Sequence, residues 1–309
     1  MKLGFIFPGQ GAQSVGMGKD LYDEYEEIRE IYQKASQISG IDIAKVTFDS
    51  PEDVLFQTKN TQIAILTMSI AILELLKKHG IQAEYTAGLS LGEYSALYCG
   101  DAIDFENVIK IVKKRGEFMQ NLVPEGEWAM AAIVGLKNSE VEKVCEQITE
   151  GFVVPANYNC PGQVAISGDK IGVAMAMEKL KEAGAKRCLE LKTAGPFHTI
   201  KLQKASDELR KELENIEIKV PQIAVIKNMD AKPYTEKDNG KDILANHVIH
   251  PVRFSDSIQY MIENGVDTFV EIGPGKVLTG FVKKVNKKVN CMNINDVASF
   301  ENAIENLKV

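Results

Sequence analysis

Short apolar runs alternate with helical repeats along most of this 309-residue chain. Residues 2–7, 85–87 and 268–272 read as short buried strands, and a glycine-containing loop and a helical pattern follow each of them. Residues 63–76 read as a buried helix that ends at Gly80. Strand–loop–helix units at both ends of the chain favour a mainly parallel sheet covered by helices. The pattern therefore predicts an α/β fold.

The rhythm changes in the middle of the chain. The expected elements there are, in chain order, a strand at 129–134, a helix capped by Ser139, strands at 152–157 and 163–167, a helix at 171–183 and a strand at 186–191. This β-α-β-β-α-β order is the ferredoxin-like signature. We predict a small ferredoxin-like domain at 124–195, inserted into a large α/β domain made of 1–123 and 196–309.

Composition narrows the class of protein. The chain is 45% hydrophobic and 26% charged, which is typical of an ordered globular protein, and its net charge of −7 argues against a general nucleic-acid binder. The start of the chain is too short an apolar run for a signal peptide, and polar residues interrupt 63–76 before it reaches the length of a bilayer span. We therefore expect a cytoplasmic protein that binds neither nucleic acid nor membrane. The sequence does not give the oligomeric state, but nothing in it suggests an obligate partner, so a monomer is expected.

Neither the cysteines nor the histidines indicate a metal centre. The five cysteines are scattered, odd in number and without CxxC spacing, as expected for free thiols in a reducing compartment. There are only four histidines, and two of them lie close together at His247 and His250. We expect no metal site and a structural role for these two histidines.

One pentad has the form of a nucleophile. Gly88-Leu89-Ser90-Leu91-Gly92 is a G-x-S-x-G sequence between a predicted strand and a predicted helix. Its glycines permit a sharp turn that exposes the serine hydroxyl, and the amide after the serine can stabilise an oxyanion. The large domain would then be α/β-hydrolase-like. A glycine-flanked serine in an ordinary turn gives the same five letters, so the pentad alone leaves both interpretations open.

A serine nucleophile needs a base, and His198 is the best candidate. It follows Gly-Pro-Phe and precedes a helical pattern, where a helix N-terminus would disfavour the imidazolium form and keep the ring neutral near pH 7. His79 lies in a Lys-Lys-His-Gly helix end and is expected to be solvated. The alternative for His198 is a simple helix cap.

Arg115 is singled out by its spacing. Phe105, Val108, Ile109 and Val112 form an apolar stripe, which Arg115 and then Met119 continue at helical intervals. An arginine on the inward face must find an anion, because an unpaired buried charge is costly. An internal carboxylate is one possibility, and the carboxylate of a substrate, gripped bidentately, is the other.

The motifs together resemble one family, the malonyl-CoA:acyl carrier protein transacylases of fatty acid synthesis. The matching blocks occur in the family's order and cover nearly the whole chain. They are Phe7-Pro8-Gly9-Gln10-Gly11-Ala12-Gln13, Gly88 to Tyr94, Arg115-Gly116 with Met119-Gln120, Asn157-Tyr158-Asn159 with Pro161-Gly162-Gln163, Gly195-Pro196-Phe197-His198, Pro251-Val252-Arg253-Phe254 and Glu271 to Leu278.

The resemblance implies a Ser–His pair that carries malonyl from coenzyme A to acyl carrier protein with no metal or redox cofactor. Ser90 would be the nucleophile and His198 the base. The backbone amides of Gln10 and Leu91 would form the oxyanion hole, and Arg115 would bind the malonyl carboxylate. The implied substrate-binding and supporting residues are Met119, Phe197, Asn159, Gln163 and His247, with Phe197 helping to exclude a methyl branch.

The chain departs from the family at several positions. Leu89 stands where His is frequent, Cys160 where Ser is common and Trp128 where a small residue is common. His247 takes the place of a usual Gln whose backbone carbonyl orients the catalytic histidine, a role that any side chain permits.

Three questions stay open at this level. A serine thioesterase or esterase with Asp101, Asp104 or Asp169 as its acid, and a trans-acting polyketide-type acyltransferase, are the alternative enzymes. A pseudo-enzyme that only docks carrier protein would form no acyl-serine. The segment Lys283-Lys284-Val285-Asn286-Lys287-Lys288, with Lys186-Arg187, can supply a docking patch for an acidic carrier protein, or it can be a set of solvated lysines.

Overall fold

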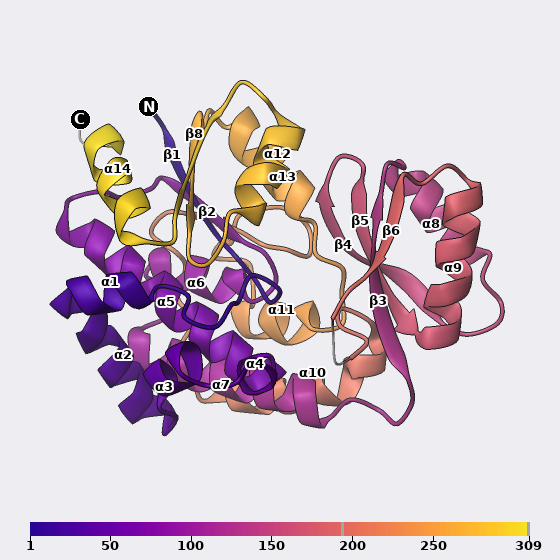
Figure 1. Cartoon of the computed structure of the whole chain (residues 1–309), viewed down its shortest axis with the longest axis horizontal. Coiled ribbons are helices and arrows are strands. Elements are labelled where there is room, and N and C mark those ends of the chain that lie inside the picture. Colours follow the sequence, from indigo (N-terminus) through magenta and orange to yellow (C-terminus); the bar gives the residue numbers. More distant parts are fainter. Residues whose placement is uncertain (193–194, 308–309) are drawn as a thin grey trace.

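A computed structural model describes residues 1–192 and 195–307, and it contains two sheets (Figure 1). The larger sheet has five parallel strands in the order β7-β2-β1-β8-β9. Its strands are β1 (Leu3–Phe7), β2 (Tyr85–Gly88), β7 (Ala224–Ile226), β8 (Thr268–Ile272) and β9 (Asn290–Ile294). The predicted α/β class with a mainly parallel sheet is confirmed.

Helices cover both faces of the larger sheet. The helices around it are α1 (Lys19–Glu24), α2 (Glu26–Ser39), α3 (Ile43–Phe48), α4 (Glu52–Leu55), α5 (Thr58–Lys78), α6 (Gly92–Cys99), α7 (Phe105–Asn121), the 3₁₀ helix η1 (Ile200–Leu202), α10 (Gln203–Glu214), α11 (Gly240–His247), α12 (Phe254–Glu263), α13 (Val277–Val285) and α14 (Val297–Leu307). Side chains alternate across the central strand: Phe5 and Phe7 join the core under α5 and α7, whereas Ile6 joins the core under α12 and α13. Both faces are therefore buried, as a parallel sheet requires.

The predicted helix at 63–76 is the middle of α5, which continues to Lys78. By length and composition it is the single described helix that is apolar enough to cross a bilayer, and 89% of its most apolar window is buried inside the protein. Its apolar side chains pack against α2 and α7. α5 is thus a core helix of the larger α/β unit.

The smaller sheet stands to one side of the larger body (Figure 1). It is antiparallel, in the order β4-β5-β3-β6, and α8 (Asn138–Glu146) and α9 (Lys170–Glu182) pack on it. Its strands are β3 (Trp128–Val134), β4 (Val153–Cys160), β5 (Gln163–Asp169) and β6 (Arg187–Glu190). The β-α-β-β-α-β order and this strand order confirm the ferredoxin-like prediction.

Two local predictions in this sheet were wrong. Ser139 does not cap α8, because the N-cap residue is Lys137. The backbone N–H of Lys137 donates to the Glu140 carboxylate at 2.8 Å. β4 also runs on to Cys160, so that only Pro161 and Gly162 form the turn to β5, with Gly162 at φ 76°.

The sequence did not predict two strands of the larger sheet, β7 and β9. β7 has only three residues, and β9 is half-buried and mixes polar with apolar positions, so neither gives a clear apolar run. The domain boundaries at 123/124 and 195/196 stay a prediction, because residues 193–194 lie outside the described part of the chain.

Candidate active site

Ser90 lies at the sharp turn between β2 and α6. Its φ of 55° is in the left-handed region, which costs a non-glycine residue on the order of 1–3 kcal/mol. The flanking glycines permit this turn, because a Cβ on Gly88 would lie 1.9 Å from the Gly92 carbonyl carbon, and one on Gly92 would lie 2.1 Å from the Phe7 oxygen. The G-x-S-x-G pentad therefore forms a strained elbow that presents the serine hydroxyl.

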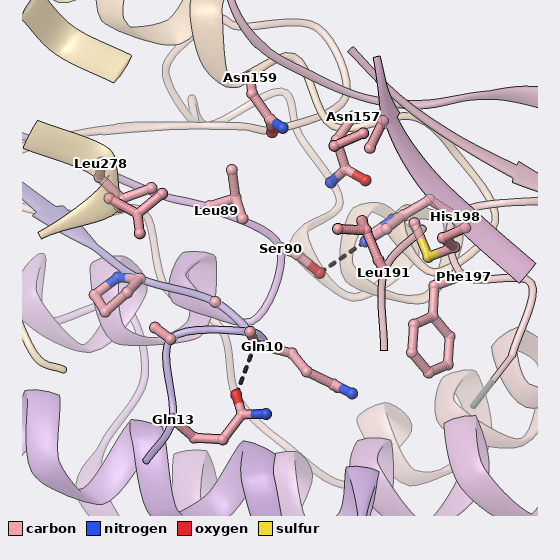
Figure 2. Close-up of a pocket in the computed structure, with 18 of the residues that line it drawn as sticks. Gln10, Gln13, Leu89, Ser90, Asn157, Asn159, Leu191, Phe197, His198 and Leu278 are labelled. Carbon is pink, nitrogen blue, oxygen red and sulfur yellow. Dashed lines mark hydrogen bonds between the residues drawn. The ribbon is translucent and has the colours of Figure 1, made fainter. Parts of the chain in front are cut away.

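His198 faces this hydroxyl (Figure 2). Its Nε2 lies 2.7 Å from Ser90 Oγ, and its Nδ1 lies 3.0 Å from the His247 carbonyl and 3.1 Å from the His250 carbonyl. Carbonyl oxygens only accept, so the proton of a neutral ring resides on Nδ1 and the Nε2 lone pair points at the serine. This is the arrangement of a general base with its nucleophile.

The environment keeps the base neutral. Burial and then the Arg115 cation lower the pKa of His198 to about 4, although its two carbonyl contacts act in the opposite direction. The sequence attributed neutrality to a helix N-terminus, and that contribution stays a prediction. The helical segment after His198 begins as the 3₁₀ turn η1, which Thr199 caps, so that burial and a neighbouring cation account for the neutral ring.

Arg115 projects from α7 into the same site. Its side chain is 1% exposed, its Nη2 donates to Ser90 Oγ at 3.1 Å, and its Nη1 donates to Gln62 Oε1 at 2.7 Å. The Tyr94 ring lies 5.4 Å from the guanidinium. Among residues 1–192 and 195–307, no ion pair includes Arg115, so its charge is available for an anion beside the serine.

Two backbone amides are free to act on the reacting carbonyl. Over the described ranges, neither the Gln10 nor the Leu91 N–H donates to another protein group. In the loop after β1, Gln13 Oε1 instead accepts from Gly11 N–H at 2.7 Å, the contact drawn below Gln10 in Figure 2. Leu91 is the N-cap of α6, where the first amides have no helical partner. Such donors can bind an oxyanion.

These groups open into a cavity of about 410 Å³ between the two sheets. Of the side chains named from the sequence, Met119, Phe197, Asn159 and Gln163 line it, and Asn157 faces it as well (Figure 2). The cavity lining includes many apolar side chains, with Arg115 and His198 beside the serine and side-chain amides along the β4–β5 wall, a composition that suits a small acyl group attached to a polar arm.

His247 lies behind the base and contributes through its backbone. Its ring is fully buried and stacks obliquely on His198 with 5.2 Å between ring centroids, and its Nδ1 is 3.4 Å from Glu93 Oε2. Burial, followed by the neighbouring His198 and Arg115, lowers the pKa of His247 well below its usual range, whereas burial raises that of Glu93 to about 7. The His247 ring is therefore neutral, and the contact is not an ion pair.

Sequence reasoning missed four contributors to the site. They are Gln62, which holds Arg115; the His250 carbonyl; and Asn228 and Glu93, which lie under the elbow. A buried Gln within the apolar helix α5 was a visible signal. Asn228 follows the unpredicted strand β7, so nothing local marked it.

The positions that depart from the family lie mostly outside the cavity. Leu89 lines it, but Cys160 and Trp128 do not. Cys160 is buried at the end of β4, and Trp128 begins β3 with its indole N–H donating to the Pro124 carbonyl at 2.8 Å. Neither the Cys160 nor the Trp128 side chain therefore lines the cavity.

The aspartates that a serine hydrolase would use lie elsewhere. Asp104 caps α7, Asp169 caps α9, and Asp101 lies 3.9 Å from Lys77. Two backbone carbonyls occupy the place of the acid on His198 Nδ1. The arrangement is a Ser–His pair in which the carboxylate of a triad is replaced by carbonyls.

Basic side chains lie near Gln163, which lines the cavity. Lys284 on α13 donates to Gln163 Oε1 at 3.2 Å, and the adjoining end of the smaller sheet carries the exposed Lys186 and Arg187. We call Lys186, Arg187 and Lys284 the basic rim. Lys283 is less available, because it is half-buried and its ammonium donates to the Val289 carbonyl at 2.6 Å.

Metal ligands do not gather anywhere in the described ranges. Residues 1–192 and 195–307 contain no group of three or more His, Cys, Asp or Glu side chains placed to hold a metal ion.

Comparison with known proteins places these features in a family. The family described as acyl transferase domain matches residues 4–303. A malonyl CoA-acyl carrier protein transacylase of Bacillus subtilis (strain 168) is 44% identical over 309 residues, which is 99% of this chain and 98% of the relative.

Solved structures agree closely with the fold. A malonyl CoA-acyl carrier protein transacylase from Clostridium perfringens superposes with a TM-score of 0.95 at 45% identity, covering 99% of this chain and 97% of the other. A second structure, of a type II polyketide synthase acyl carrier protein in complex with its malonyl-transacylase, has a TM-score of 0.95 at 38% identity and covers 99% and 100% of the two chains.

Proposed function

The chain belongs to the acyl transferase domain family, and on this premise we propose that it transfers malonyl from malonyl-CoA to the phosphopantetheine thiol of acyl carrier protein, for fatty acid biosynthesis. The transfer runs through a malonyl ester on Ser90. Relatives that are 38% and 44% identical to this chain are named malonyl CoA-acyl carrier protein transacylases, and the similarity covers 99% and 98% of their length.

The position of Arg115 is the observation that carries the choice of malonyl. Its guanidinium lies 3.1 Å from the nucleophilic oxygen and has a neutral amide, not an internal carboxylate, as its second partner. In a malonyl group the free carboxylate is separated from the reacting carbonyl by a single methylene. An acyl group on Ser90 Oγ therefore brings its carboxylate within reach of the guanidinium, which binds carboxylates bidentately.

The first half-reaction acylates the serine. Ser90 Oγ attacks the thioester carbonyl as His198 Nε2 accepts the hydroxyl proton. The Gln10 and Leu91 amides hold the oxyanion of the tetrahedral intermediate. When that intermediate collapses, the carbon–sulfur bond breaks, and His198 returns the proton to the departing coenzyme A thiolate.

The second half-reaction reverses these steps with a different thiol. The thiol of the carrier's phosphopantetheine gives its proton to His198 and attacks the ester, and Ser90 leaves with that proton. Asn157, Asn159 and Gln163 present amides along the wall by which a phosphopantetheine arm would enter, and the basic rim faces an acidic carrier. The two half-reactions involve only two thiols and one serine ester, and they balance in protons and electrons. We therefore propose no metal or redox cofactor.

A polyketide-type carrier is the second candidate acceptor. It is favoured by the solved complex described above, in which a transacylase of the same fold holds a type II polyketide synthase carrier. A hydrolase is disfavoured by Arg115 and by the carbonyls on His198 Nδ1. We place the enzyme in the cytoplasm, where its bacterial relatives' substrates, coenzyme A thioesters, are made.

Incubation of the protein with labelled malonyl-CoA alone tests this function. Mass spectrometry should show one malonyl adduct on Ser90, and addition of carrier protein should move the label to the carrier. Ser90→Ala should abolish the adduct. Release of free malonate as the main product would identify a hydrolase, and absence of any adduct would identify a protein without this catalytic activity.

A further inference from the structure

Asn228 lies just beyond β7, next to the turn between β2 and α6 that carries Ser90. β7 ends at Ile226, which is paired with Ala87 of β2, and Asn228 comes two residues later. Beyond this rung β2 has no strand partner on that side, yet Gly88 and Ser90 still have backbone groups to satisfy. The Asn228 side chain occupies the place of the missing strand.

All four polar groups of Asn228 are used. Oδ1 accepts from Ser90 N–H at 2.7 Å, and Nδ2 donates to the Gly88 carbonyl at 2.6 Å. Its backbone N–H donates to Glu93 Oε2 at 3.0 Å, and its carbonyl accepts from Arg253 N–H at 2.8 Å. The side-chain amide thus bonds to Gly88 and Ser90, on either side of Leu89, as the backbone of a neighbouring strand would. Asn228 itself is fully buried.

Glu93 anchors this asparagine to the helix that follows the elbow. It lies in the first turn of α6 and is fully buried, with Oε2 on Asn228 and Oε1 accepting from the Tyr234 hydroxyl at 2.5 Å. Asn228 and Glu93 together connect β7, the elbow and α6. Neither residue lines the cavity, so neither reaches the acyl group.

We propose that Asn228, held by Glu93, is a positioning residue for acyl transfer: it fixes the left-handed backbone of Ser90 so that Oγ stays in line with His198. The proposal rests on the proposed function. Ser90 holds φ 55°, a conformation that its side chain disfavours, and its amide has Asn228 Oδ1 as its acceptor. Without that acceptor the partly buried amide gains by rotating toward another partner, and the hydroxyl moves with it.

The expected signature separates positioning from binding. Arg115 and the cavity wall are untouched by a change at 228, so malonyl-CoA should bind as before and the preference for malonyl over acetyl should persist. The chemical step should slow, because a small misplacement of the nucleophile reduces the rate strongly. Loss of kcat with little change in KM is the predicted split.

Asn228→Ala is the test variant, and Thr47→Ala is its control. Thr47 is also fully buried and donates to a backbone carbonyl at 2.7 Å, but it lies on α3 and does not line the cavity. Single-turnover mixing with malonyl-CoA gives both the acylation rate and the final amount of malonyl-Ser90. For Asn228→Ala we expect at least a tenfold slower rate with full final acylation and KM within threefold, and for Thr47→Ala an unchanged rate.

Three outcomes would overturn the proposal: an unchanged acylation rate in Asn228→Ala, a loss seen only as a smaller acylated fraction, or an equal slowing in the control. If Asn228→Ala does not fold, Glu93→Leu serves instead. Leucine has no acceptor, so the Asn228 backbone N–H and the Tyr234 hydroxyl both lose the partner that Glu93 gave them. Acylation should slow in the same way by a smaller factor, and an unchanged rate there would be equally fatal. Failure of the wild-type protein to form malonyl-Ser90 would count against the proposed function and not against this role of Asn228 alone.

Discussion

Arg115→Ala tests how the site chooses its substrate. In the wild-type protein the guanidinium is buried and reaches both Ser90 Oγ and Gln62 Oε1, so a bound malonyl carboxylate would meet it away from bulk water. Contacts between buried charges of this kind are typically worth about 2–5 kcal/mol. At about 1.4 kcal/mol for each factor of ten, this corresponds to a loss of about 30-fold to about 4,000-fold in malonyl transfer.

The ratio of malonyl to acetyl transfer isolates the carboxylate contact. Arg115→Ala also removes the bond to Ser90 and leaves Gln62 Oε1 without its donor, but those losses affect both acyl groups alike. Acetyl lacks the carboxylate, so kcat/KM for malonyl should fall far more than kcat/KM for acetyl. Arg115→Lys should be intermediate, because an ammonium keeps the charge and loses the planar fork.

Lys114→Ala is the matched control on the same helix. Lys114 is 41% exposed and lies within 3.8 Å of Glu117 and Glu212 carboxylate oxygens, away from the cavity. Coenzyme A thioesters of malonate and acetate, assayed with one carrier protein, give the two kcat/KM values for each variant. An unchanged malonyl-to-acetyl ratio in Arg115→Ala, or an equal change in Lys114→Ala, would refute the assignment.

Two further predictions concern pH and docking. His198 acts as a base, and its pKa is lowered to about 4. The rate of single-turnover acylation should therefore be constant from pH 8 down to about 5 and should fall on further acidification, as Nε2 becomes protonated. An inflection of the rate near pH 6.5 would contradict the buried-base interpretation. Charge reversal at Lys284 together with Arg187 should raise the KM for carrier protein more than the KM for malonyl-CoA. The control Lys34→Glu, on the distant α2, should change neither KM. Equal effects on the two KM values would contradict the basic rim as the docking surface.

The chemistry of the site was readable from the sequence wherever it resides in a local pattern. The G-x-S-x-G pentad requires its glycines, because a Cβ on Gly88 or on Gly92 would overlap neighbouring backbone atoms. Both glycines lie within five consecutive residues, so the sequence shows this requirement directly. Helical spacing predicted that Arg115 lies on the buried face of α7, and the family resemblance implied its role toward the substrate. The ferredoxin-like order followed from strand and helix patterns in the same way.

Only the tertiary structure decided what surrounds those groups. Ser90 and Asn228 are separated by 138 residues, and His198 meets the carbonyls of His247 and His250 across 49 and 52 residues. Backbone carbonyls carry no side-chain signature, and the three-residue strand β7 that delivers Asn228 is too short to show a period. A local pattern can specify which groups are present and which way a helix face points. Their distances, and the burial that lowers the pKa of the base, arise only when distant segments pack together.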